Sequence, residues 1–378
     1  MWKFSSELEM LRDTVRRIAN EVIAPRAAEI DNTSEFPWDV KKLLQRQGIF
    51  SVGFPPAYGG GDQPHLAACL AIEEIARVCV SSSLILQVQF LGSSPIVLAG
   101  TDAQKDNYLP PLVAGERLIA FGLTEPGAGS DAAAMATTAR LEGDHYVLNG
   151  LKHFISNAIV SDVFTVFAMT DRSKGTRGIS AFIVEKDYPG FRFGRTEQKM
   201  GIHGSPTGEL VFEDCIVPRG NLLGREGEGF KIAMKSLDPA RVTLAAQAVG
   251  VAQAALSFAV KYARERVQFG NPISQLQGIQ FMLADMAAQV EAARALTYHA
   301  AQQADEDAPD LSYLASAAKL TASEMAMRVT TDAVQIAGGY GYLTEFPAER
   351  YMRDAKVTQI YDGTSQVQRL VIARHLLR

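Results

Sequence analysis

The chain has 378 residues, a mass of 41.0 kDa and a net charge of −5, with 47% apolar and 21% charged residues. This length predicts two or three domains with large hydrophobic cores, and the composition excludes a disordered or fibrous protein. The slightly negative charge gives no support for binding to nucleic acid or to an anionic membrane surface. Three cysteines without a CxxC pair argue against a disulfide scaffold and a zinc site, so we expect no metal and a reducing compartment.

The N-terminal third is predicted to be helical. Apolar residues recur at spacings of three and four from Leu8 to Val22, and Pro25 is expected to end this helix. Further helices are predicted over four ranges, 38–47, 65–79, 83–99 and 102–114. The first residues lack the basic start and apolar centre of a signal peptide. No uncharged apolar run is expected to be long enough to span a bilayer, so membrane insertion is not predicted.

The middle third is rich in glycine and in short β-prone runs. It holds fifteen of the 31 glycines, between residues 115 and 224. Strands are predicted at 145–148, 151–156, 163–169, 179–185, 191–195 and 209–217. The pair Asn149-Gly150 is a strong turn signal, so a hairpin is predicted there. Short strands at this spacing indicate an antiparallel barrel or sandwich.

The last third returns to long apolar helices, predicted at 229–263, 274–304, 311–336 and 365–377. Helices of this length pack as a bundle. The predicted fold class is therefore α+β, with an all-α domain at 1–117, a β domain at 118–224 and a helical bundle at 225–378.

One glycine-rich segment has the spacing of a dinucleotide-binding motif. Residues 127–132, GAGSDA, form a nominal GxGxxA. That motif must follow a strand and open a helix, whereas here the chain runs on toward strands. Spacing alone favours a glycine-rich turn. The functional alternative is a turn whose amides and hydroxyls, from Thr124 and Ser130, meet a polar cofactor.

Four other segments carry an ordinary and a functional interpretation side by side. In KHFISN (152–157), Phe154 and Ser156 share a strand face, either by plain alternation or to stack on and hydrogen-bond a planar ring. The arginines of RERVQFG (264–270) suit phosphates or a helix C-terminus. QIAGGYG (335–341) fits a helix cap or a close backbone approach. In YDGTSQ (361–366), Thr364 or Ser365 is the expected helix N-cap, and Asp362 is a turn residue or a general base.

In this order the segments resemble the acyl-CoA dehydrogenase family of flavoproteins. The matching blocks are LTEPGAGSD (123–131), KHFISN (152–157), GEGFKIAMKSLDPAR (227–241), RERVQFG (264–270), QIAGGYGY (335–342), RDAKVTQIYDGTSQVQR (353–369) and VIAR (371–374). They span most of the chain. The resemblance implies that the β domain is an antiparallel barrel and that the last domain is a four-helix bundle.

The resemblance also implies bound FAD, an acyl-CoA substrate and α,β-desaturation, in which a base takes the α-proton while the β-hydrogen leaves as hydride to flavin N5. The flavin ring would be contacted by Leu123, Thr124, Phe154 and Ser156. The rest of the dinucleotide would be bound from a neighbouring subunit by Arg266, Gln268, Phe269, Gln335, Gly338 and Gly339, and from the first subunit by Thr364 and Gln366. The substrate would be bound by Ser130, Asp238, Arg241, Gly363 and Arg374. A cofactor shared between subunits leads us to expect a homotetramer, a dimer of dimers.

The expected base departs from the family's usual residue. Most relatives carry Glu where this chain has Asp362, which is shorter by one C–C bond, about 1.5 Å. A misplacement of about 1 Å can cost ~10²-fold in rate. Three explanations of the shorter side chain remain open. The loop or the substrate lies closer and restores the distance, the pocket accepts a substrate with bulk at Cα, or the protein catalyses a different reaction. Some relatives place the base at the position of Ala240, which cannot serve, so Asp362 is predicted to be catalytic.

The helix at 83–99 is expected to line the acyl pocket through Leu84 and Gln87. Residues 81–99 carry no charge, which argues against a dicarboxylic substrate. We therefore expect a short-chain, branched or alicyclic acyl-CoA, with electron-transfer flavoprotein as the acceptor. The alternatives are a nitroalkane-oxidase-like enzyme and a catalytically silent flavin- or acyl-CoA-binding protein. The missing presequence favours a bacterial cytoplasmic protein over one of the mitochondrial matrix.

Overall fold

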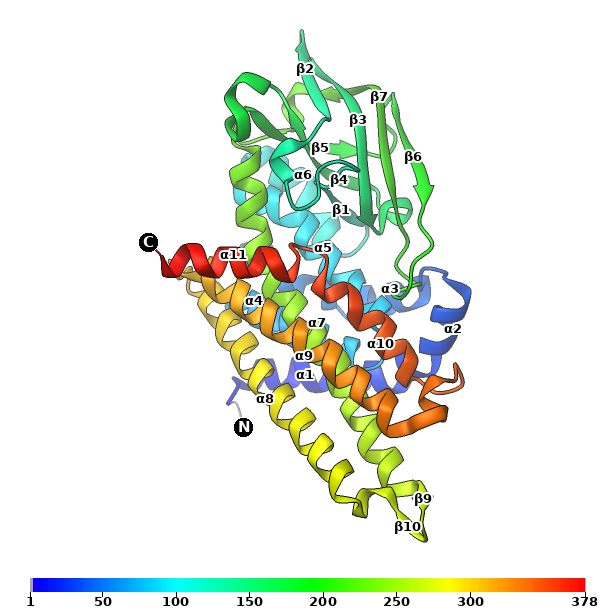
Figure 1. Ribbon diagram of the computed structural model, residues 1–378. Coiled ribbons are helices and arrows are strands. Elements are labelled where there is room, and N and C mark those ends of the chain that lie inside the picture. Colours follow the sequence, from blue (N-terminus) through cyan, green and yellow to red (C-terminus); the bar gives the residue numbers. More distant parts are fainter. Residues whose placement is uncertain (1–2, 378) are drawn as a thin grey trace.

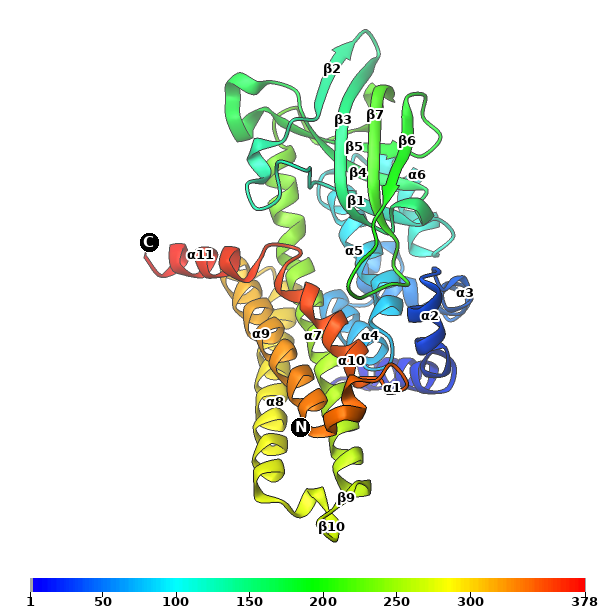
Figure 2. The ribbon, with the colours of Figure 1, turned by 45° about the vertical axis from the view of Figure 1, so that its right-hand side comes forward.

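Helices, strands and helices follow one another along the chain, as the α+β prediction requires. The computed structural model describes residues 3–377 (Figure 1). The β region lies at one end of an elongated molecule, the N-terminal helices lie beside its middle, and long C-terminal helices extend to the other end. The C-terminal helix crosses between the sheet and the bundle (Figure 2).

Six α-helices form the N-terminal region: α1 (Ser6–Ile18), α2 (Ala27–Thr33), α3 (Trp38–Arg46), α4 (Pro64–Ala76), α5 (Val80–Ala99) and α6 (Asp102–Val113). Pro25 does not end the first helical stretch as predicted. The chain passes through a π turn at Ala19–Ile23 and a 3₁₀ turn at Ala24–Arg26 and continues into α2. A proline is tolerated in the first turn of a new helical segment, where its missing N–H leaves no partner unpaired.

Two helices correct the expectation that no apolar run is long enough to cross a membrane. By length and composition alone, both α5 and α7 (Gly229–Glu265) could do so. In the fold, 67% of the relevant window of α5 and 83% of that of α7 are buried inside the protein. α5 packs against α4, α7 and the sheet, so both helices fill the core of this structure.

The β region is one mixed sheet. Its strands are β1 (Ile119–Gly122), β2 (Thr138–Glu142), β3 (His145–Ser156), β4 (Val163–Met169), β5 (Ile179–Glu185), β6 (Phe191–Thr196), β7 (Thr207–Pro218) and β8 (Leu222–Leu223). The order is β6-β7-β3-β2-β4-β5-β8, and β1 also pairs with β4. Most pairs are antiparallel as expected, while β1–β4 and β2–β4 are parallel. The sequence pattern did not reveal β1 or β2.

The predicted hairpin at Asn149-Gly150 is wrong. These residues lie inside the continuous strand β3, where the register against β7 shifts between Leu148 and Gly150. The Asn149 side chain bonds Asp214 of β7 in both directions, at 2.9 Å each. Gly150 is needed because a Cβ there would meet the Thr137 side chain at 2.5 Å. Pairing with a neighbouring strand therefore turned a local turn signal into a β-bulge.

The C-terminal region contains α7, α8 (Gln277–Asp305), α9 (Leu311–Ala337), α10 (Ala348–Lys356) and α11 (Ser365–Leu376). A two-stranded ribbon, β9 (Val267–Gln268) and β10 (Asn271–Pro272), lies at the far tip of the bundle (Figure 1). Buried alanines let α7, α8 and α9 pack closely. The sequence pattern missed the short, highly charged helix α10.

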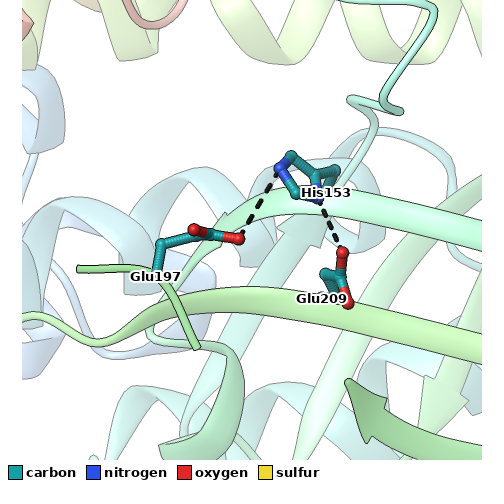
Figure 3. Close-up of side chains that lie close together, drawn as sticks. All are labelled: His153, Glu197 and Glu209. Carbon is teal, nitrogen blue, oxygen red and sulfur yellow. Dashed lines mark hydrogen bonds and ion pairs between the residues drawn. The ribbon is translucent and has the colours of Figure 1, made fainter. Parts of the chain in front are cut away.

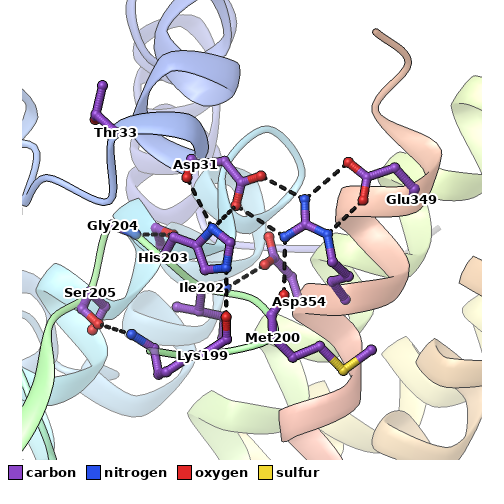
Figure 4. Close-up of polar contacts among 12 residues, drawn as sticks. Asp31, Thr33, Lys199, Met200, Ile202, His203, Gly204, Ser205, Glu349 and Asp354 are labelled. Atoms are coloured by element: carbon purple, nitrogen blue, oxygen red, sulfur yellow. Dashed lines mark hydrogen bonds and ion pairs between the residues drawn. The ribbon is translucent and has the colours of Figure 1, made fainter. Parts of the chain in front are cut away.

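A polar cluster ties α10 to the N-terminal helices and to the loop after β6 (Figure 4). Arg353 of α10 bonds Asp31 of α2 and Glu349, each at 2.6 Å. The neighbouring Asp354 accepts the N–H of Ile202 at 2.6 Å. The cluster lies eight residues before Asp362, so it anchors the segment that leads into the predicted catalytic loop.

We expect Asp354→Asn to remove a pH dependence of stability. Burial raises the pKa of Asp354 to about 6 from an ordinary value near 3.8. The folded protein therefore holds this proton more tightly than the unfolded chain, and stability is lost as pH rises from about 4 to about 6. Asparagine keeps the acceptor for Ile202 without the charge. At pH 8 the variant should be more stable by up to about 3 kcal/mol.

Urea unfolding of both proteins at pH 4.5, 6 and 8 measures this effect. The gap between variant and wild type should shrink toward pH 4.5. Asp187→Asn, at an exposed position, is the control and should leave the curve unchanged. A gap that stays constant with pH would contradict the assignment.

Candidate active site

The loop at 123–131 and the end of β3 are joined by a buried lysine. The Lys152 ammonium donates to the Glu125 carboxylate at 2.6 Å and to the Leu123 carbonyl at 3.2 Å. The backbone N–H of His153 donates to the Thr124 carbonyl at 2.8 Å. The structure thus brings together Leu123, Thr124 and the strand that carries Phe154.

The Lys152–Glu125 pair holds the loop from inside. Lys152 is fully buried, and burial lowers its pKa to about 8 against the pull of Glu125. Burial alone would raise the pKa of Glu125, but the Lys152 charge lowers it, together with bonds from the N–H groups of Ala136 and Thr137 at 2.5 and 3.0 Å. Sequence reasoning missed this pair. The signal in the sequence was an acidic residue, Glu125, in the block at 123–131 and a lysine, Lys152, in the block at 152–157, which together can form an ion pair.

Phe154 is exposed and has an unusual backbone. Its φ is +58°, a region that bulky residues rarely adopt, and 60% of the residue is accessible. Ser156 follows on the same strand, and Asn157 binds the Leu84 carbonyl of α5 at 3.2 Å. A strained backbone that presents a large aromatic ring to solvent is typical of a ligand site.

The neighbouring His153 lies between two carboxylates (Figure 3). Its Nδ1 is 3.0 Å from Glu209 and its Nε2 is 3.8 Å from Glu197. These three form the only grouping of potential metal ligands among residues 3–377. The two ring nitrogens face different carboxylates, so the geometry suits separate contacts of the imidazole with each carboxylate better than three ligands around one ion.

Asp362 and Gly363, here called the Asp362 turn, are held by their carbonyl groups. Both residues have positive φ, +52° and +92°. The Asp362 carbonyl accepts from Arg241 of α7 and from Gln368 of α11, each at 3.3 Å. The Gly363 carbonyl accepts from Lys319 of α9 at 2.7 Å and from Gln368 at 2.8 Å. Within residues 3–377, the N–H of Asp362 has no acceptor, so it is free to bind a ligand oxygen.

The electrostatics of the turn are those of a partly desolvated carboxyl group near two cations. Burial raises the pKa of Asp362, while the charges of Lys319 and Arg241 oppose the rise. Burial lowers the pKa of Lys319 to about 8. A carboxylate with a raised pKa is a stronger base, which suits proton abstraction.

Arg241 also binds Asp238 at 2.8 Å, and Ser312 of α9 donates to the same Asp238 oxygen at 3.2 Å. Burial raises the pKa of Asp238 against the pull of Arg241. The structure therefore joins two predicted substrate residues, Asp238 and Arg241, directly to the Asp362 turn. The nearby Ala240 offers no functional group.

Tyr361 connects the turn to α5 and α7. Its hydroxyl donates to Gln247, whose amide donates to Ser83 at 2.8 Å. Gln87 also hydrogen-bonds Tyr361, and its Oε1 is buried without a partner among residues 3–377. The predicted pocket residue Gln87 thus lies one contact from the residue before Asp362, and Leu84 lies buried one turn earlier on α5.

The remaining predicted residues near the turn lie on α11 and in the glycine-rich loop. Thr364 caps α11, since its hydroxyl accepts from the Val367 N–H at 3.2 Å. Gln366 is exposed in the first turn of α11, Arg374 is exposed in its last turn, and Ser130 is exposed in the loop. Among the described residues, no hydrogen bond or ion pair joins Ser130 or Arg374 to Asp238.

A second group of predicted residues gathers at the far tip of the bundle. The Arg266 guanidinium lies 5.2 Å from the centre of the Tyr340 ring. Phe269 is 92% exposed with a φ of +54°. The residues predicted for this group are Arg266, Gln268 and Phe269 after α7, and Gln335, Gly338 and Gly339 at the end of α9. Figure 1 shows the end of α9 and the β9–β10 ribbon at the far end of the bundle, away from the sheet that carries Phe154.

Both groups fit an extended dinucleotide. A Cβ built on Gly127, Gly129, Gly338 or Gly339 would meet no atom within 4 Å, so a ligand can approach the backbone there. Phe154 offers an aromatic face, and Arg266 offers a cation for phosphate. In this chain the two groups lie apart, one beside the sheet and the other at the tip of the bundle.

The chain is similar to known proteins over most of its length. Three family models match consecutive parts of the chain: "Acyl-CoA dehydrogenase, N-terminal domain" at residues 5–116, "middle domain" at 120–215 and "C-terminal domain" at 227–377. Together they cover most of the sequence.

Individual relatives match over their full length. The chain is 49% identical to a short-chain-specific acyl-CoA dehydrogenase of Clostridium acetobutylicum, with 100% of each chain covered. It superposes on butyryl-CoA dehydrogenase of Megasphaera elsdenii with a TM-score of 0.97 and 47% identity, covering 100% of each. A structure described as electron transferring flavoprotein of Acidaminococcus fermentans, from work on flavin-based electron bifurcation, gives 0.98 and 51%, again covering 100% of each.

Proposed function

Because this chain belongs to the acyl-CoA dehydrogenase family, we propose that it desaturates a short-chain acyl-CoA that carries bulk at Cα, with Asp362 as the base. The protein is an acyl-CoA dehydrogenase, an oxidoreductase, and its cofactor is FAD. The substrate range, the base and the residue roles below are our proposal.

The Asp362 turn carries this proposal. A thioester α-proton is weakly acidic and becomes removable only when charge developing on the carbonyl oxygen is stabilised. The free N–H of Asp362 supplies a donor for that oxygen, while the Asp362 carboxylate takes the proton. Arg241 holds the carbonyl of the same residue at 3.3 Å, so base and donor are positioned by one turn.

Bound FAD supplies the acceptor for the β-hydride. We assign Leu123, Thr124, Phe154 and Ser156 to its ring and Thr364 and Gln366 to its chain. The tip residues Arg266, Gln268, Phe269, Gln335, Gly338 and Gly339 would bind the dinucleotide of a neighbouring subunit. Ser130, Asp238, Arg241, Gly363 and Arg374 would bind the CoA thioester, with Leu84 and Gln87 at the acyl group.

We also propose an oligomeric state, a redox partner and a cellular location for the enzyme. The distance between the two cofactor groups within one chain supports a homo-oligomer, for which we propose the dimer-of-dimers tetramer. The likeness to the Acidaminococcus fermentans structure supports electron-transfer flavoprotein as redox partner. Three free, buried cysteines suit a reducing, cytoplasmic location.

The test is an anaerobic titration of the purified holoenzyme with acyl-CoAs, followed by the flavin absorbance. The panel contains linear, 2-methyl-branched and cyclohexane-carboxyl thioesters. Bleaching by short branched or cyclic members, and less by linear ones, supports the proposal. If only the linear thioesters bleach the flavin, the proposal that the substrate carries bulk at Cα is wrong. If none bleaches the flavin, nitroalkane turnover under oxygen distinguishes an oxidase from a silent binding protein.

We expect Asp362→Glu to shift preference toward linear substrates. The added methylene moves the carboxylate about 1.5 Å further into the pocket, where it would crowd a substituent at Cα. The ratio of kcat/KM for linear over branched thioesters should rise about tenfold or more. A substrate profile identical to that of the wild type would contradict the idea that Asp362 makes room for bulk.

A further inference from the structure

A lysine that no sequence motif singled out lies beneath the Asp362 turn. Lys319 is fully buried on α9, and its ammonium donates to the Gly363 carbonyl at 2.7 Å. Within residues 3–377 it forms no ion pair within 4.0 Å. A buried ammonium without a counter-ion in contact is costly, so its position requires a physical reason.

Hydrogen bonding alone does not supply that reason. The Gly363 carbonyl already accepts from the Gln368 amide at 2.8 Å. An apolar residue at position 319 would therefore leave no buried carbonyl unpaired and would avoid the desolvation of a charge. What the lysine adds beyond Gln368 is a positive charge next to the turn.

The charge environment of the turn shows where that charge acts. From α7 the turn faces Arg241, which is itself paired with Asp238. From α9 it faces Lys319, with Glu324 further along the helix. α5 contributes no charged residue. The adjacent titratable group is Tyr361, a half-buried neutral phenol, with Asp354 beyond it. Because Arg241 is partly neutralised by Asp238, Lys319 is the cation near Asp362 that has no carboxylate in contact.

We propose that Lys319 is a positioning residue for Asp362, which fixes the turn through the Gly363 carbonyl and keeps the Asp362 carboxyl group ionised between turnovers. The inference rests on the proposed function, because it assigns Asp362 as the base. We assign Lys319 no direct role in binding the substrate or the cofactor. It acts through the turn and through its charge.

Three variants of Lys319 separate the effect of its charge from the effects of its hydrogen bond to Gly363 and of its packing. Lys319→Met keeps the length and removes both charge and bond. Lys319→Gln retains a donor without the charge, and Lys319→Arg retains the charge. Lys41→Met is the matched control, since Lys41 is also a buried lysine, on α3, where it bonds Gln45 at 3.0 Å.

Two readouts are needed, and only one depends on turnover. The first is the acid limb of kcat/KM against pH for the thioester that bleaches the flavin. The second is the infrared carbonyl band of protonated Asp362 in the holoenzyme, identified by its loss in Asp362→Asn and titrated with pH. An opposite charge within about 4–6 Å lowers a carboxyl pKa by about one to three units, and the Lys319 charge lowers the pKa of Asp362 in this sense.

We expect both midpoints to rise by about one unit in Lys319→Met and Lys319→Gln, with about a tenfold loss of kcat/KM below the shifted midpoint. Lys319→Arg and Lys41→Met should keep the wild-type midpoint. Unmoved midpoints in Lys319→Met or in Lys319→Gln would overturn the proposal, whatever their effect on stability. If no acyl-CoA bleaches the wild type but the infrared midpoint shifts, the proposed function fails, whereas the effect of Lys319 on the charge of Asp362 stands.

Discussion

Replacing Asp362 with asparagine should abolish substrate-driven flavin reduction while leaving FAD bound. Asparagine has nearly the same shape and cannot accept a proton at neutral pH, and general bases contribute about 10²–10⁴-fold to rate. Because this base has no substitute at Ala240, we expect the loss to reach at least about 10³-fold. The backbone N–H of residue 362 is unchanged, so thioester binding should persist.

Anaerobic stopped-flow mixing with the best thioester of the panel measures the loss. FAD content and the binding of a non-oxidisable thioester are recorded on the same sample. Asp106→Asn, at an exposed position on α6, is the control and should reduce the flavin at the wild-type rate. Wild-type reduction by Asp362→Asn would show that another group removes the proton.

Replacing Glu125 with alanine should lower the free energy of unfolding more than any of the other substitutions described above. The change leaves the Lys152 ammonium buried without its partner and strips two backbone N–H groups, of Ala136 and Thr137, of their acceptor. Breaking a buried pair from one side costs about 3–5 kcal/mol. The loop at 123–131 should loosen with it, so retention of FAD should fall as well.

A double variant tests the physical cause. In Glu125→Gln with Lys152→Met, the amide oxygen can still accept from the backbone, and no buried charge remains. It should recover at least half of the unfolding free energy lost in Glu125→Ala, measured by urea unfolding of the holoenzyme. Glu213→Ala breaks the exposed pair with Arg192 and should leave the free energy of unfolding almost unchanged, because water screens this pair. Equal losses in the buried and exposed pairs would contradict this account.

Much of the architecture follows from local patterns. The helices α3 to α9 and the strands β4 to β7 begin and end close to their predicted positions because each carries an apolar period of its own. The motif blocks that identify the family are likewise short and continuous. Asp362, Thr124 and Phe154 could be singled out because each lies inside such a block.

Other elements were decided by partners distant in the sequence. Asn149-Gly150 is a turn by local preference, and pairing with β7 made it a bulge. α10 has too few apolar residues to be recognised alone, and it is held by the ion pairs of Arg353 with Asp31 and Glu349. In both cases tertiary contacts outweighed a weak local signal.

The sequence by itself determined the succession of helical, β and helical regions, the family and the identity of the candidate base. Only the tertiary structure decided what surrounds that base. Lys319 precedes the carbonyl it binds by 44 residues, and Lys152 follows Glu125 by 27. By local pattern alone, a lysine on a helix is expected at the surface. Lys319 is buried because α9 packs against the Asp362 turn. Burial and charge proximity arise from that packing, and no local pattern encodes them.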